Sequence, residues 1–230
     1  MFVLRKNLQL NNVTFSEAKN LDIPGAKLSF ININNLDKII VQGPKLRTVS
    51  GVRRWLNKDN NKYDYDIEFA FDDKPQSQEL LKKSEELDNI IKTTIKARSK
   101  EWLGKQLSDE VLNFQYKPIV KYNNGITLKT GEVKDFNPSI VLKLQVDNSK
   151  FVSSKETELL VFDENNNPVD FSVDDFSTGK NFDVHNLICG NMMIIPVYEV
   201  SFLSFTKTSI KPRLKLVQAK IFPNTSNKIT

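Results

Sequence analysis

The segment Tyr63-Asp64-Tyr65-Asp66-Ile67-Glu68-Phe69-Ala70-Phe71 decides the fold class, because bulky apolar side chains alternate in it with acidic ones. Successive side chains of a β-strand point to opposite faces, so this period of two predicts a strand with a buried aromatic face and a polar face. On its N-terminal side the runs 2–10, 27–33 and 38–42 are short and apolar or alternating, with Asn, Gly and Pro between them. These features predict further strands.

On the C-terminal side of that segment, apolar residues recur every three or four positions from Gln78 to Phe114, which predicts one or two helices. Ser108 is a candidate cap for the second helix. Strand patterns return at Pro118, and turn residues separate them. The later strands are expected at 118–122, 139–146, 158–162, 192–205 and 213–222, and the turns at 123–125 and 165–168.

Together these patterns predict a mainly β (α+β) protein, a Greek-key barrel with a helical insertion at about 76–114. The whole chain, 1–230, is expected to form one domain with a short flexible C-terminal tail at 223–230, because no long linker divides it. The segment 43–55 contains Gly-Pro and a second glycine. It is therefore expected to be a turn-rich surface loop that can close over a ligand.

The net charge of +5 over 230 residues conceals a strong segregation of charge along the chain. The segment 37–58 holds six basic residues and one acid, and 200–230 holds six basic residues and no acid. Between them, 151–199 holds nine acids and two lysines. The small total is therefore a cancellation between two basic zones and one acidic zone.

Both basic zones also contain aromatic residues, a combination that suits single-stranded nucleic acid. Cations contact the phosphates, and flat side chains stack on bases for about 1–3 kcal/mol per base without reading the sequence. The expected phosphate contacts are Lys45, Arg47, Arg53, Arg54, Lys207, Lys211, Arg213 and Lys215, and the expected stacking residues are Trp55, Phe202 and Phe205. The alternative is a solvated charged face above ordinary core aromatics, and the sequence leaves the burial of Trp55 open.

The sequence contains no recognisable catalytic constellation. The single cysteine, Cys189, and the single histidine, His185, exclude a disulfide framework and any site built from several imidazoles. No phosphate-binding loop occurs in the sequence either. We therefore expect a non-enzymatic protein with no catalytic residues, metal or cofactor. A metal-dependent nuclease stays as a weaker alternative because carboxylates are paired at 64/66, 72/73, 163/164 and 174/175.

Several segments, taken in order, resemble a known family. The first is Val41-Gln42-Gly43-Pro44-Lys45-Leu46-Arg47 with Gly51-Val52, and the second is 63–71. The next are Ser99-Lys100-Glu101-Trp102-Leu103-Gly104-Lys105 and Tyr116-Lys117-Pro118-Ile119-Val120-Lys121-Tyr122, and the last is 198–221. From about Ile40 to Phe222 the chain thus resembles the single-stranded DNA-binding proteins of nucleocytoplasmic large DNA viruses. These are distant relatives of the single-stranded DNA-binding proteins of short-tailed coliphages.

The resemblance implies an OB-fold with a helical insertion, and sequence-independent binding of single-stranded DNA in viral replication, recombination or repair. Its implied partners are single-stranded DNA and viral replication proteins, and a homo-oligomer is left open. Two features depart from the family: 204–210 has no glycine in the expected hairpin, and 223–230 is not acidic. Recruitment of replication enzymes through an acidic tail is therefore not predicted.

The expected location is intracellular, without membrane insertion or secretion, because no apolar run has the length of a signal peptide or a membrane span. The family resemblance narrows this location to the cytoplasm or the viral replication factory of an infected host cell.

Other functions stay open at the level of sequence. A viral structural, scaffolding or genome-packaging protein would also carry a basic surface, but without a preference for single strands. RNA is not excluded, because stacking and phosphate contacts do not read the 2′-hydroxyl group. The acidic stretch 156–175 either competes with DNA for the basic groove, binds a partner's basic face, or is a solvated loop.

Overall fold

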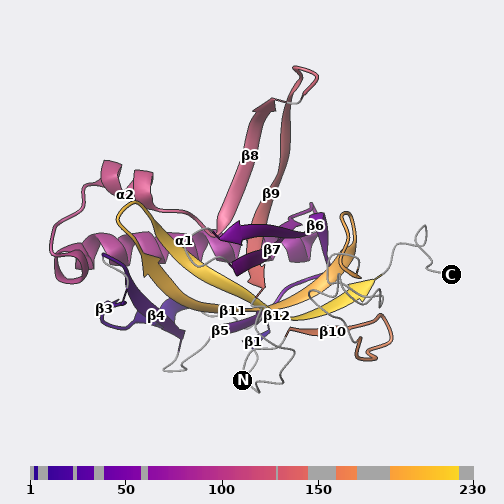
Figure 1. The fold of residues 1–230 in the computed structure, drawn as a ribbon, viewed down its shortest axis with the longest axis horizontal. Helices are drawn as coiled ribbons and strands as arrows, with labels where there is room; N and C mark the ends of the chain where they lie inside the picture. The colour runs from indigo at the N-terminus through magenta and orange to yellow at the C-terminus, as the bar shows by residue number, and fades with distance from the viewer. Residues whose placement is uncertain are drawn as a thin grey trace.

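The fold is built around a closed five-stranded β-barrel (Figure 1). The computed structural model describes residues 3–4, 10–22, 25–33, 39–57, 62–127, 129–144, 159–169 and 187–222. The barrel strands are β6 (Leu46–Asn57), β7 (Lys62–Ala70), β9 (Val133–Leu144), β11 (Met193–Phe205) and β12 (Ile210–Phe222).

The strand order around the barrel is β6-β7-β9-β12-β11, and β11 returns to β6. The pairs β6–β7, β7–β9 and β11–β12 are antiparallel, whereas β9 and β12 are parallel through Lys143 and Lys215. Met193 pairs with Arg47 and closes the ring. The parallel pair forces the chain to cross between strands rather than form simple hairpins, which is the Greek-key connection of an OB-fold. The predicted fold class is confirmed.

The barrel interior is filled by the aromatic face of β7. Tyr65, Ile67 and Phe69 are at most 1% exposed, and Phe71 continues the same face beyond the end of the strand. Leu142, which pairs with Ile67, is also fully buried. Burial of each such side chain stabilises the fold by about 1.5–3 kcal/mol, so this strand anchors the core as its alternation predicts.

Smaller strands extend the barrel on both sides. β11 also pairs with β4 (Lys27–Ile33) and β5 (Ile39–Gln42) in antiparallel fashion. The remaining short elements are β1 (Val3–Leu4), the 3-10 helix η2 (Leu10–Asn12), β2 (Val13–Phe15), β3 (Lys19–Asn20) and β10 (Leu160–Phe162). The long strand β11 therefore belongs both to the barrel and to an adjoining sheet that contains β4.

The helical insertion consists of α1 (Pro75–Leu103) and α2 (Asp109–Gln115), between β7 and β8 (Val120–Thr127). Proline is tolerated in the first helical turn, and Gly104 ends α1 in the left-handed conformation. The hydroxyl of Ser108 accepts a hydrogen bond from the Val111 N–H at 3.3 Å, so the predicted cap of α2 is confirmed.

A buried carboxylate joins α1 to the segment that leads into β8. Asp88 is 6% exposed and accepts hydrogen bonds from the Tyr116 hydroxyl at 2.5 Å and from the Ile119 N–H at 2.9 Å. Burial raises the pKa of Asp88, while the hydrogen bonds from Tyr116, Ile119 and Val120 act in the opposite direction. The contact holds the helical insertion to the barrel.

Two local predictions are wrong. The segment 43–55 is mostly strand β6 and not a loop, because Gly51 forms a bulge inside the strand rather than a turn. Gly51 has φ 73°, and a Cβ there would lie 2.6 Å from the Ile188 carbonyl oxygen. The predicted turn 123–125 lies inside β8, which forms with β9 a long hairpin that projects from the barrel (Figure 1).

The predicted turn at 165–168 is confirmed. Asn166 has φ 68°, and the Asp163 carboxylate accepts hydrogen bonds from the backbone N–H groups of Asn165 and Asn167. Five of the seven acidic residues of the stretch 156–175 lie outside the described residues, as do His185 and the expected tail 223–230.

Candidate nucleic-acid interface

A row of charged side chains crosses the outer face of the barrel. Arg53 on β6 pairs with Asp66 on β7, Asp66 pairs with Lys143 on β9, and Lys143 pairs with Lys215 on β12. Directly paired residues of neighbouring strands share a face of the sheet. The apolar face of β7 fills the barrel, so this charged row lies on the outside.

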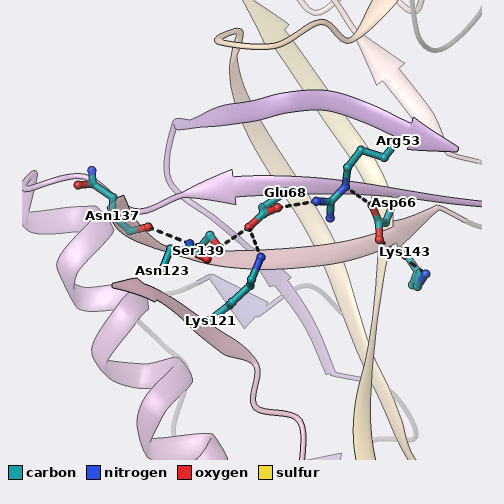
Figure 2. A network of polar contacts seen from close by, with 8 residues as sticks. All are labelled: Arg53, Asp66, Glu68, Lys121, Asn123, Asn137, Ser139 and Lys143. Atoms are coloured by element: carbon teal, nitrogen blue, oxygen red, sulfur yellow. Dashed lines mark hydrogen bonds and ion pairs between the residues drawn. The ribbon is translucent and has the colours of Figure 1, made fainter. Parts of the chain in front are cut away.

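Two carboxylates of β7 hold the cations around them in place (Figure 2). The Arg53 guanidinium donates from Nε to Asp66 at 2.8 Å and from Nη1 to Glu68 at 2.7 Å. Lys143 Nζ lies 3.7 Å from the second oxygen of Asp66, and Lys121 Nζ lies 3.5 Å from Glu68. Both carboxylates are under 10% exposed, so they form the floor of the cluster and the cations its surface.

Glu68 is further fixed by the Ser139 hydroxyl, which donates to its carboxylate at 2.6 Å. Burial on its own raises the pKa of Glu68, but the hydrogen bond from Ser139 and the charges of Lys121 and Arg53 outweigh it and lower that pKa. Glu68 is therefore ionised near neutral pH, and it neutralises part of the positive charge of Arg53 and Lys121.

Two further cations, Lys211 and Arg213, lie near Lys143 beside this pair of carboxylates. Burial is the largest cause that lowers the pKa of Lys143, and the charges of Lys211 and Arg213 lower it further, against the pull of Asp66. Burial and then the charge of Arg213 likewise lower the pKa of Lys211. For both lysines, burial and the neighbouring cations outweigh the attraction of the carboxylates. Lys143, Lys211 and Arg213 thus form a site that an added anion would stabilise.

An aromatic ring lies next to these cations. Trp55 shares the outer face of β6 with Arg53 and is 36% exposed, which answers the question that the sequence left open. Lys143 Nζ lies 3.7 Å from the centroid of its ring, a cation–π contact. The indole is therefore held in a fixed position at the edge of the cluster.

We call Arg53, Trp55, Lys143, Lys211 and Arg213, with Asp66 and Glu68 beneath them, the outer-face cluster. It spans β6, β7, β9 and β12. β7 and β9 are the second and third strands of the barrel, whose outer face binds oligonucleotides in OB-folds.

The structure brings together only part of the predicted site. Arg53, Trp55, Lys211, Arg213 and Lys215 lie on the outer face of neighbouring strands. Phe202 lies beside them, because it pairs with Arg213.

Four predicted phosphate contacts lie elsewhere. Arg54 pairs with the buried Tyr65 and so lies on the opposite face of β6 from Arg53. Lys207 is exposed in the turn between β11 and β12. Lys45 and Arg47 lie at the other end of β6, where Lys45 Nζ is 3.6 Å from the ring centroid of Phe222 and Arg47 bonds to Asn191.

The prediction that Phe205 stacks on a base is wrong. Phe205 is 1% exposed and packs with its ring edge-on to the buried Trp102, with 5.7 Å between the ring centroids. It is a core residue. Phe202 is half-buried and forms an edge contact with Phe30, which is 40% exposed.

Comparison with known proteins adds no identification. No family model and no curated protein matches the chain.

Among the described residues, no three His, Cys, Asp or Glu side chains gather in a way that could hold a metal ion. Of the paired carboxylates, Asp72 binds Lys74 and Asp163 caps a turn, while Asp174 and Asp175 lie outside the described residues. No described helix is long and apolar enough to cross a membrane.

A cavity between α1 and the barrel has a volume of about 10 Å³, enough for a single water molecule. It is lined mainly by apolar side chains such as Leu87 and Val200, and its small volume leaves no room for a substrate.

Sequence reasoning missed Lys143, Lys121 and Phe30. None of them lies in a basic zone of the sequence, so charge counting does not find them. Lys143 has a weaker signal, because it alternates with the buried Leu142 and Leu144 in a predicted strand and must therefore point outward.

Proposed function

We propose that the protein binds single-stranded DNA on the outer-face cluster, without reading its sequence. One observation carries this proposal: Lys143, Lys211 and Arg213 are crowded together beside the exposed Trp55 on the face that OB-folds use for oligonucleotides. Phosphate groups relieve the repulsion among the cations, and the indole offers a surface on which any base can stack.

The physical design favours a single strand over a duplex. The cluster combines cations with a flat apolar ring, and only an unpaired base exposes its face to such a ring. Contacts to phosphate and to the face of a base carry no sequence information. The resemblance to viral single-stranded DNA-binding proteins suggests a role in viral DNA replication, recombination or repair, with replication proteins as further partners. No chemical step is needed for this role.

The tryptophan fluorescence of the protein tests this proposal. Trp102 is 1% exposed, so quenching by a bound strand reports on Trp55. Oligo(dT) is expected to quench the fluorescence at low salt, and a duplex of equal length is expected to bind far more weakly. The Trp55→Phe variant is expected to lose the quenching signal.

Three other results would contradict the proposal in different ways. Equal weak binding of single strand and duplex supports a scaffolding or genome-packaging protein instead. Tighter binding of oligo(U) than of oligo(dT) assigns the site to RNA. Cleavage that depends on Mg²⁺ indicates a nuclease.

A further inference from the structure

A second aromatic surface lies on the far side of the cation row from Trp55. It consists of Phe202 on β11 and Phe30 on β4, which pair directly between the two strands. Their ring centroids are 6.3 Å apart with an interplanar angle of 73°, an edge-to-face contact. Phe30 is 40% exposed, so this pair is partly open to solvent.

The phenylalanine pair continues the outer-face cluster. Phe202 pairs with Arg213 across β11 and β12, and Arg213 Nε donates to the Ser204 hydroxyl on β11 at 3.1 Å. Cations and rings therefore follow one another across neighbouring strands: Trp55, Lys143, Arg213, Phe202 and Phe30. The path follows the curved outer surface of the barrel through β6, β7, β9, β12, β11 and β4, five strand spacings, or about 24 Å measured along that surface.

The backbone around Phe30 is fixed. Its N–H donates to the Ser16 hydroxyl at 2.9 Å, its carbonyl accepts from the Ser16 N–H at 3.0 Å, and the Ser29 hydroxyl donates to the Ser16 carbonyl at 2.7 Å. An aromatic side chain on a fixed backbone loses little conformational entropy when it binds a ligand. The exposed ring is thus ready to make a contact without rearrangement.

We infer that Phe30, with Phe202 beside it, forms a second base-stacking platform, and that a single strand follows the outer surface of the barrel from Trp55 round to β4. The inference rests on the proposed function and deepens it, because it assigns the path of the bound DNA strand and a contact residue, Phe30, outside the barrel. The phosphates between the two platforms then lie over Lys143 and Arg213, and the bases at the two ends stack on Trp55 and Phe30.

The test places a fluorescent reporter at the new platform. Phe30→Trp is made in the Trp55→Phe background, where the one other tryptophan, Trp102, is buried. Oligo(dT) of about 15 nucleotides is expected to quench the new indole as it quenches Trp55 in the wild-type protein. If the double variant binds oligo(dT) and its fluorescence does not change, no base lies at position 30 and the inference is wrong.

An affinity measurement separates stacking from structural support. Phe30→Leu keeps an apolar side chain but loses the flat ring, and it is expected to weaken oligo(dT) binding about 5-fold or more, the loss of one stacked base. Binding of an abasic oligomer, which has phosphates but no bases, is expected to be unchanged. Equal loss with both oligomers, or no loss with either, would overturn the inference.

Phe114→Leu is the matched control, because Phe114 is 79% exposed and lies on α2, which is not one of the strands of the path. It is expected to leave oligo(dT) affinity unchanged. If the wild-type protein does not bind oligo(dT) at all, the proposed function fails together with the inference. If it binds oligo(dT) with quenching of Trp55, but Phe30→Leu keeps the wild-type affinity or the indole of Phe30→Trp is not quenched, the inference alone fails.

Discussion

Neutralising the buried carboxylate Asp66 should strengthen the binding of single-stranded DNA. Asp66 lies 3.7 Å from Lys143 Nζ, and a phosphate oxygen on the outer side of that ammonium adds about 3 Å. The two negative charges are then at most about 7 Å apart. Their repulsion is about 0.6 kcal/mol in bulk water and about 2.4 kcal/mol at an effective dielectric constant of 20. Because the cluster is open to solvent, we expect the lower figure, about a threefold gain in affinity.

The assay is a titration of Asp66→Asn with oligo(dT) at a series of salt concentrations. Asparagine keeps an oxygen that accepts from Arg53 Nε, and the midpoint of thermal unfolding checks that the fold survives. Lys143 loses a competing partner, so the plot of log K against log salt should become steeper by up to about 0.7. Asp73→Asn removes the same charge from an exposed position before α1 and serves as the control. If Asp66→Asn weakens binding, or behaves as Asp73→Asn does, the cluster is not where the phosphates bind.

Three further predictions concern the framework that holds the site. Gly51→Ala should lower the free energy of unfolding in urea by more than Gly104→Ala does. Both glycines have φ 73°, but only at Gly51 would the added Cβ lie 2.6 Å from a backbone carbonyl oxygen. Equal losses would contradict the role of the bulge. The lowered pKa of Glu68 adds stability that is present above pH 4.5 and is lost as pH falls through the folded-state pKa. Glu68→Gln should therefore make the free energy of unfolding depend less on pH on the acid side. The raised pKa of Asp88 has the opposite effect on stability, because its contribution is present below pH 3.8 and is lost as pH rises through the folded-state pKa. The stability of the wild type relative to Asp88→Asn should therefore decrease over that pH range. An increase would show that the pKa of Asp88 is not raised in the folded protein.

The sequence predicts the elements whose signals are local. The alternation of 63–71 defines β7, and the spacing of apolar residues defines the helical insertion, because in both cases the pattern lies within the element itself. The strand β6 could not be found in this way. Gly51 is read as a turn residue from its neighbours, whereas its conformation depends on Ile188 and Cys189, which are distant in the sequence.

Only part of the candidate site can be predicted from the sequence, again because the rest depends on contacts between distant segments. Composition finds Arg53 and Arg54 together, but the register of β6 with β7 places them on opposite faces. The same rule could have separated Phe202 from Phe205, since residues three apart in a strand point to opposite faces. Lys143 comes close to these residues through pairing between strands, and such pairing is not visible in any one segment.

We expect phosphates to bind at the outer-face cluster and not over the basic surface in general. The salt dependence of oligo(dT) binding tests this expectation most directly. Lys211→Gln with Arg213→Gln should reduce the slope of log K against log salt by about 1.4, two phosphate contacts on a single strand. Lys45→Gln with Arg47→Gln removes the same charge at the other end of β6 and should leave the slope nearly unchanged. Equal reductions in the two double variants would contradict phosphate binding at the outer-face cluster.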